Sequence, residues 1–160
     1  MIEYLLKFSR QVIIWSVVLY FALSIPISLL HELGHVSVCA ASGFDYRIWV
    51  DATGGHMLCS GRPQERLAYN AMGGIFGAIV SAAILASWTL AKRHYAVLVV
   101  GLAYMVDQIA KIILEGFYTR LYEVHTLDGY ITALQIVSWI GFMLYFARVS
   151  EPAKIAASDI

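Results

Sequence analysis

Charged side chains are scarce in this chain. Asp, Glu, Lys and Arg together make up 14% of its 160 residues, whereas hydrophobic residues make up 60%. A soluble domain is about half apolar and about a quarter charged. The mean hydropathy of +0.71 points the same way. This composition excludes an ordinary soluble domain and predicts an integral membrane protein.

The chain also lacks an excess of either charge. Eleven basic and eleven acidic residues give a formal net charge of zero, so nothing favours a nucleic-acid partner. The length allows one membrane-embedded domain over residues 1–160, with no appended soluble module. The N-terminus is not typical of a cleaved signal peptide, because its apolar run continues far past the usual length.

Cysteine is nearly absent, since Cys39 and Cys59 are the only two. Their spacing does not force them to pair, and two cysteines say little about the compartment. Cys39 comes four residues after His35, so it could be a soft metal ligand, but helix packing is the commoner role for such a residue. Cys59 falls in a predicted strand.

Apolar segments long enough to cross a bilayer fill most of the chain. We expect crossings over about 2–41, 64–91, 95–117 and 127–149, with a short polar turn at 92–94. Within the first of them, the uncharged part over 11–30 is already long enough to cross a bilayer. The lipid bilayer is therefore an obligatory partner. The predicted fold is an all-α polytopic membrane protein with about four transmembrane helices.

Residues 44–62 interrupt this pattern. They alternate in polarity around Gly54 and Gly55, which predicts a short β-hairpin at the membrane interface. The hairpin would either connect two crossings or offer a free edge to an extended peptide. Before it, Gly43 is expected to end the first helix and Pro26 to kink it.

Residues 31–35 read His-Glu-Leu-Gly-His and lie inside the first apolar segment. Positions i and i+4 share one face of a helix, so His31 and His35 can bind one zinc ion. Glu32 follows directly and can act as general base on the attacking water. Two hydrogen-bonded core histidines are the plainer alternative, but three ionisable groups in an apolar setting are costly without a metal.

A catalytic zinc takes three protein ligands and leaves one position for water. Asp128 is our preferred third ligand, because it begins the last apolar segment at the same side of the membrane as the histidines, and a helix N-cap is its alternative role. The other candidates are Glu115, Glu123, His125 and Cys39. Asp107, Lys111 and Glu115 share one face of the third segment, which is typical of a charge ladder facing the bundle interior.

His-Glu-Leu-Gly-His in a membrane segment, followed later by Leu127-Asp128-Gly129, resembles the site-2 protease family of intramembrane zinc metalloproteases. The resemblance spans about residues 10–149, including the β-rich segment and the glycine-rich stretch from Asn70 to Gly74. It implies one zinc ion held by the two histidines and Asp128, with Glu32 activating water.

One element of that family is missing here. The family commonly has Asn-Pro shortly before Asp-Gly, and its asparagine helps to position the substrate or the oxyanion. This chain has no such pair between Tyr118 and His125. Asn70 and Arg120 are our candidates for a substitute polar donor.

We therefore predict a zinc-dependent endopeptidase that cleaves a membrane-anchored protein or peptide in or near its transmembrane segment. A zinc hydrolase acting on lipidated peptides, and a membrane chaperone or adaptor that retains a zinc site, are the alternatives. A metal transporter fits poorly, because the chain has no second intramembrane His/Asp cluster. The oligomeric state is not encoded in any visible pattern.

The orientation in the membrane is indicated in two conflicting ways. With the N-terminus inside, six basic residues lie at the inner ends of the helices and four in the outer loops, which weakly supports that arrangement. The family usually places its active site nearer the cytosolic face, which would put this N-terminus outside. We follow the family and expect a cytosol-facing site.

Overall fold

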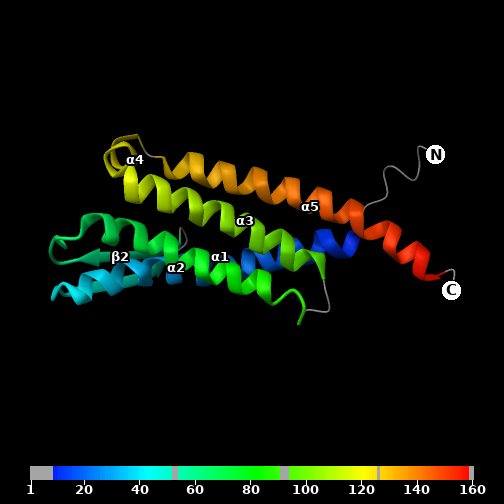
Figure 1. Cartoon of the computed structure of the whole chain (residues 1–160), viewed down its shortest axis with the longest axis horizontal. Coiled ribbons are helices and arrows are strands. Elements are labelled where there is room, and N and C mark those ends of the chain that lie inside the picture. The colour runs from blue at the N-terminus through cyan, green and yellow to red at the C-terminus, as the bar shows by residue number, and fades with distance from the viewer. Residues whose placement is uncertain (1–8, 52–53, 91–93, 126, 159–160) are drawn as a thin grey trace.

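The protein is described by a computed structural model that covers residues 9–51, 54–90, 94–125 and 127–158, without the side chains of residues 123–125, 128 and 151–158. Four long helices run lengthwise in an elongated bundle (Figure 1). They are α1 (Arg10–Ala41), α2 (Arg66–Ala86), α3 (Tyr95–Lys111) with its π-helical continuation η2 (Ile112–Phe117), and α5 (Asp128–Ser158). The predicted fold class is confirmed.

Each helix, with η2 counted as part of the third, is long and apolar enough to cross a membrane. Many large apolar side chains point outward, such as Phe21 at 64% and Val137 at 68% exposure. Apolar exposure on this scale would be unfavourable in water but suits contact with lipid. The protein is thus a multi-pass membrane protein.

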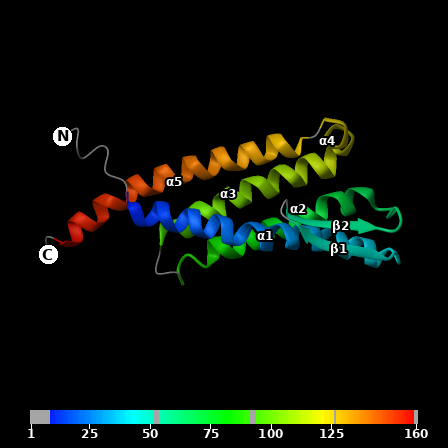
Figure 2. The same cartoon turned by 180° about the vertical axis from the view of Figure 1, so that it is seen from behind.

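The helix ends sort into two groups (Figure 2). The end of α1, the hairpin, the start of α2, η2 and the start of α5 lie together at one end of the bundle, here called the site end, and the start of α1 and the end of α5 lie at the other. A short helix, α4 (Thr119–His125), lies between η2 and α5. All residues discussed as a functional site belong to the first of these two ends.

The hairpin consists of β1 (Tyr46–Asp51) and β2 (Gly54–Cys59), paired antiparallel from Tyr46↔Cys59 to Asp51↔Gly54. The two glycines predicted for the turn instead begin β2. A Cβ on Gly55 would lie 3.0 Å from the Leu29 backbone, and its N–H donates to Ser28 Oγ at 2.8 Å. These glycines therefore let the backbone of β2 lie against α1.

A disulfide joins Cys39 to Cys59 and ties the end of α1 to the last residue of β2. The chain reverses at Gly43, which has a φ of +78° and ends α1 as predicted. The hairpin then folds back and brings the two cysteines together, although their sequence spacing did not indicate it. Because Cys39 is bonded to Cys59, it is not a metal ligand in this structure.

Small residues allow close packing of α1, α2 and α3. A Cβ on Gly34 would overlap the Met72 backbone, and one on Gly74 would lie 2.6 Å from Ile112 Cγ1. A Cβ on Gly77 would overlap the side-chain amide of Gln108. The three helices can therefore approach closely enough for side chains from α1 and η2 to meet.

Candidate metal centre

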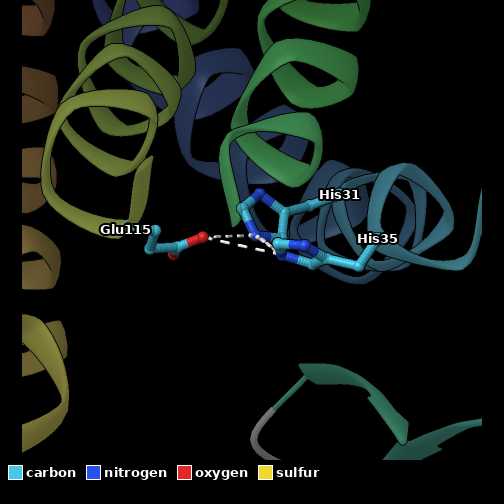
Figure 3. Close-up of side chains that lie close together, drawn as sticks. All are labelled: His31, His35 and Glu115. Atoms are coloured by element: carbon cyan, nitrogen blue, oxygen red, sulfur yellow. Dashed lines mark hydrogen bonds and ion pairs between the residues drawn. The ribbon is translucent and has the colours of Figure 1, made fainter. Parts of the chain in front are cut away.

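Two helices supply three metal-ligating side chains that converge at one point (Figure 3). His31 and His35 lie one turn apart on α1, and Glu115 comes from η2. The Nε2 atoms of the histidines are 3.2 Å apart, and Glu115 Oε2 lies 3.4 Å from His31 Nε2 and 3.6 Å from His35 Nε2. His31 and Glu115 are buried, and His35 is nearly so.

Hydrogen bonds on the far side of each imidazole fix its orientation. His31 Nδ1–H donates to Gln108 Oε1 at 2.9 Å, and His35 Nδ1–H donates to the Tyr69 carbonyl at 2.7 Å. Because both acceptors are carbonyl oxygens, the ring proton of each neutral histidine lies on Nδ1. Both Nε2 lone pairs then face the same point, as metal ligation requires.

Gln108 is itself held by a second contact. Its Nε2 donates to Asp107 Oδ2 at 2.6 Å, and Asp107 pairs with Lys111 Nζ at 3.5 Å. A carboxylate only accepts, so this bond orients the amide with its oxygen toward His31. The predicted Asp107–Lys111 pair is thus present, and Asp107 also contacts the glutamine that lies behind His31.

The spacing of the three ligand atoms fits a tetrahedral cation. Zinc binds nitrogen and oxygen at about 2.0–2.1 Å, which places neighbouring ligand atoms about 3.3 Å apart. The three separations above lie within a few tenths of an ångström of that value. Two imidazole lone pairs that face each other at 3.2 Å cannot hydrogen-bond to one another, and a cation between them removes their repulsion. The residues present therefore fit a metal ion.

Gly73 on α2 closes the site from one side. A Cβ there would lie 2.6 Å from His31 Nε2 and would overlap His35 Nε2. Any larger residue would occupy the space between the ligands. Gly73 is thus the residue that leaves room for an ion.

Glu115 was one of several candidates, and the structure brings it to the histidines. Asp128, the preferred third ligand, has a side chain outside the described residues, as do Glu123 and His125. The ligand role of Asp128 therefore stays a prediction. The donor set that the described residues assemble is two histidines and one glutamate, which is a known set for catalytic zinc.

The π-helical segment explains why the sequence did not single out Glu115. In a regular α-helix Glu115 would stack above Lys111 and extend the charge ladder. In η2 the hydrogen bonds run from i to i+5, so each residue turns less and Glu115 faces α1 instead. π-Helical turns are rare and occur frequently at functional sites, but no pattern in this sequence marks one.

A cavity of about 270 Å³ opens onto the ligands. Glu32 lines it, as do Asn70 and Tyr122. Within the described part of the chain, no side chain is within hydrogen-bond or ion-pair distance of the Glu32 carboxylate. Asn70 donates from Nδ2 to Thr119 Oγ1 at 2.9 Å. Arg120 does not line this cavity but a neighbouring one.

Comparison with known proteins gives no relative: no protein-family model, curated protein or solved structure matches this chain.

Proposed function

We propose that the protein is an intramembrane zinc metalloprotease that hydrolyses a peptide bond in or near the transmembrane segment of a membrane-anchored substrate. The observation that carries the proposal is the convergence of both histidine Nε2 atoms and the Glu115 carboxylate at one buried point, with Glu32 in the same cavity. The resemblance of the His-Glu-Leu-Gly-His and Leu-Asp-Gly motifs to the site-2 protease family supports the same activity.

The bound zinc would polarise the scissile carbonyl and make water more acidic. Glu32 would take a proton from the attacking water and pass it to the leaving amide nitrogen. Its carboxylate can accept this proton, because no described side chain lies within hydrogen-bond or ion-pair distance of it. Asn70 lines the cavity beside it and would donate to the substrate or the oxyanion.

The hairpin gives a means of holding the substrate extended. A helical substrate hides its carbonyls in hydrogen bonds, so cleavage requires local unwinding. β1 pairs only with β2 in the described sheet, which leaves its other edge for an added strand. Met57 of β2 lines the cavity and accepts from Tyr69 Oη at 3.2 Å, so the hairpin borders the candidate metal site.

The proposed proteolysis is tested with the Glu32→Gln variant. Purified wild type and variant, both loaded with zinc, are incubated in H₂¹⁸O with a library of synthetic single-span peptides, and new termini are identified by mass spectrometry. Wild type should produce ¹⁸O-labelled carboxyl termini, and Glu32→Gln should reduce the rate at least 100-fold, the lower range for a general base. Equal rates in the two zinc-loaded proteins would contradict the proposal.

The same variant separates the alternatives. Substrate trapped by Glu32→Gln can be identified by mass spectrometry. An unmodified peptide would indicate a protease, and an acylated peptide would indicate a hydrolase of lipidated peptides. A chaperone or adaptor would function without the general base, so its activity would survive Glu32→Gln. The Glu32 carboxylate has no partner among the residues that the structure describes, which favours an enzyme, because a purely structural zinc site needs no base.

We further propose that the site end of the bundle faces an oxidising compartment. Disulfides persist in such compartments and are rare in the cytosol, and Cys39–Cys59 lies at this end. The distribution of basic residues agrees with this orientation, whereas the family resemblance predicts a cytosol-facing site.

A further inference from the structure

A second and larger cavity lies beside the candidate metal site. Its volume is about 590 Å³, within the range of about 300–1,000 Å³ typical of ligand pockets. Tyr69, Asn70 and Thr119 line both cavities. A chain bound across the ligands can therefore continue over these three residues into the larger space.

Three arginines from three different elements line this larger cavity. Arg62 precedes α2, Arg66 is the first residue of α2, and Arg120 belongs to α4. Among the described residues, no carboxylate lies within ion-pair distance of their guanidinium groups. The first turn of α2 lacks an acidic residue, and the N-cap residue Glu65 makes no side-chain hydrogen bond to the helix, so the start of α2 adds partial positive charge.

The other lining residues define the ligand further. Of the described residues that line it, Leu67 is the only large aliphatic one, Tyr69 is aromatic with a polar hydroxyl, and the remainder are polar, small or proline. A lipid headgroup could pair with arginines, but its acyl chains would need an apolar path away from the cavity. A polar, extended peptide with carboxylate side chains matches both the charge and the lining, and arginine pairs with carboxylates in a bidentate manner.

We propose that this cavity is a specificity subsite that binds an acidic segment of the substrate next to the cleaved bond. Arg62, Arg66 and Arg120, here called the arginine subsite, bind its carboxylates, and Tyr69, Asn70 and Thr119 connect the subsite with the metal centre. The inference rests on the proposed proteolysis and adds the substrate class to it: membrane-anchored chains that carry Asp or Glu where their span reaches the interface.

The test is a binding measurement that does not require cleavage. Full-length Glu32→Gln protein in dodecyl maltoside micelles is titrated with a fluorescent single-span peptide that ends in Glu-Glu-Glu, and with a matched peptide that ends in Gln-Gln-Gln. The acidic peptide should bind about tenfold tighter or more, and the preference should shrink at high salt. Each of Arg62→Gln, Arg66→Gln and Arg120→Gln should reduce it about three- to fivefold, the range of an exposed ion pair.

Arg148→Gln is the matched control. It removes the same charge from an exposed position on α5 at the opposite end of the bundle and should leave the preference unchanged. Zinc content checks that each variant keeps the neighbouring site. Equal binding of the two peptides, or a preference that the three subsite variants do not alter, would overturn the proposal.

Retention of added phosphatidylglycerol, measured by native mass spectrometry, examines the lipid alternative. Subsite variants that release this lipid but keep the peptide preference would also overturn the proposal. The binding measurement does not depend on proteolysis, because it uses the cleavage-impaired Glu32→Gln protein. A protein that does not cleave peptides could therefore still show the acidic preference. If the wild-type protein cleaves peptides but the acidic and neutral peptides bind equally, only the subsite proposal is contradicted and the proposed proteolysis stands.

Discussion

At the scale of single residues, the candidate metal centre depends on groups that bind no metal themselves. The carbonyls of Gln108 and Tyr69 fix the ring proton of each histidine on Nδ1, and Gly73 leaves the space between the Nε2 atoms free. The motif His-Glu-Leu-Gly-His predicted which residues would face one point. It could not predict these supporting groups, because they come from α2 and α3.

Gly73→Ala should abolish zinc binding while α2 persists. The added methyl group would occupy the place between the two imidazoles, whereas alanine favours a helix over glycine by about 1 kcal/mol. Zinc is counted by inductively coupled plasma mass spectrometry, and helix content is followed by circular dichroism. Gly141→Ala on α5 is the control, because its Cβ would meet nothing within 4 Å. Full zinc occupancy in Gly73→Ala would show that the ion does not bind between these histidines.

Gln108→Met should weaken zinc binding about 10–100-fold, the usual cost of losing a partner that orients a ligand. Methionine fills a similar volume but cannot accept the proton of His31 Nδ1. Competition with a chelator of known affinity measures the change. Gln135→Met replaces another buried glutamine, on α5 and outside both cavities, and should bind zinc like wild type. An unchanged affinity in Gln108→Met would exclude the orienting role.

At the scale of elements, hydropathy predicted the four spans and the alternating pattern predicted the hairpin, because both depend on local periodicity. Two features of the structure were not predicted from the sequence. The widened turns of η2 direct Glu115 toward α1, and the disulfide depends on how the hairpin folds back. Both result from packing between segments far apart in the sequence, which periodicity within one segment does not report.

Replacing both Cys39 and Cys59 with serine should loosen the hairpin without removing the metal. On the chain-entropy account, a bond across 20 residues stabilises by about 3 kcal/mol, whereas the ligands of the centre are other residues. Hydrogen exchange should therefore speed up in β1 and β2, and zinc content should stay at the wild-type value. Loss of zinc with an unchanged hairpin would instead indicate that Cys39 is a ligand.

At the scale of the whole molecule, the bundle has a site end and an opposite end, where α1 begins and α5 ends. Counting crossings predicted that the last segment would begin near the histidines, and α5 does start at the site end. The sequence could not decide which end faces the cytosol, because the basic residues are split too evenly. The disulfide at the site end is the additional structural indication.

Labelling of intact cells tests this orientation. In the serine variant at positions 39 and 59, Tyr46→Cys places a thiol at the site end and Leu90→Cys places one at the opposite end; the native side chains there are 51% and 85% exposed. A membrane-impermeant maleimide should label Tyr46→Cys directly and Leu90→Cys only after permeabilisation. The reverse pattern would support a cytosol-facing site.

The most direct test of the central claim is the zinc content of purified wild type beside Glu115→Gln, with circular dichroism to confirm folding and Asp128→Asn measured in parallel. We predict one equivalent of zinc in wild type and its loss in folded Glu115→Gln. If Glu115→Gln retains one equivalent of zinc at wild-type affinity, the assignment of Glu115 as a ligand is contradicted. If Asp128→Asn loses its zinc in the same experiment, Asp128 is the third ligand instead.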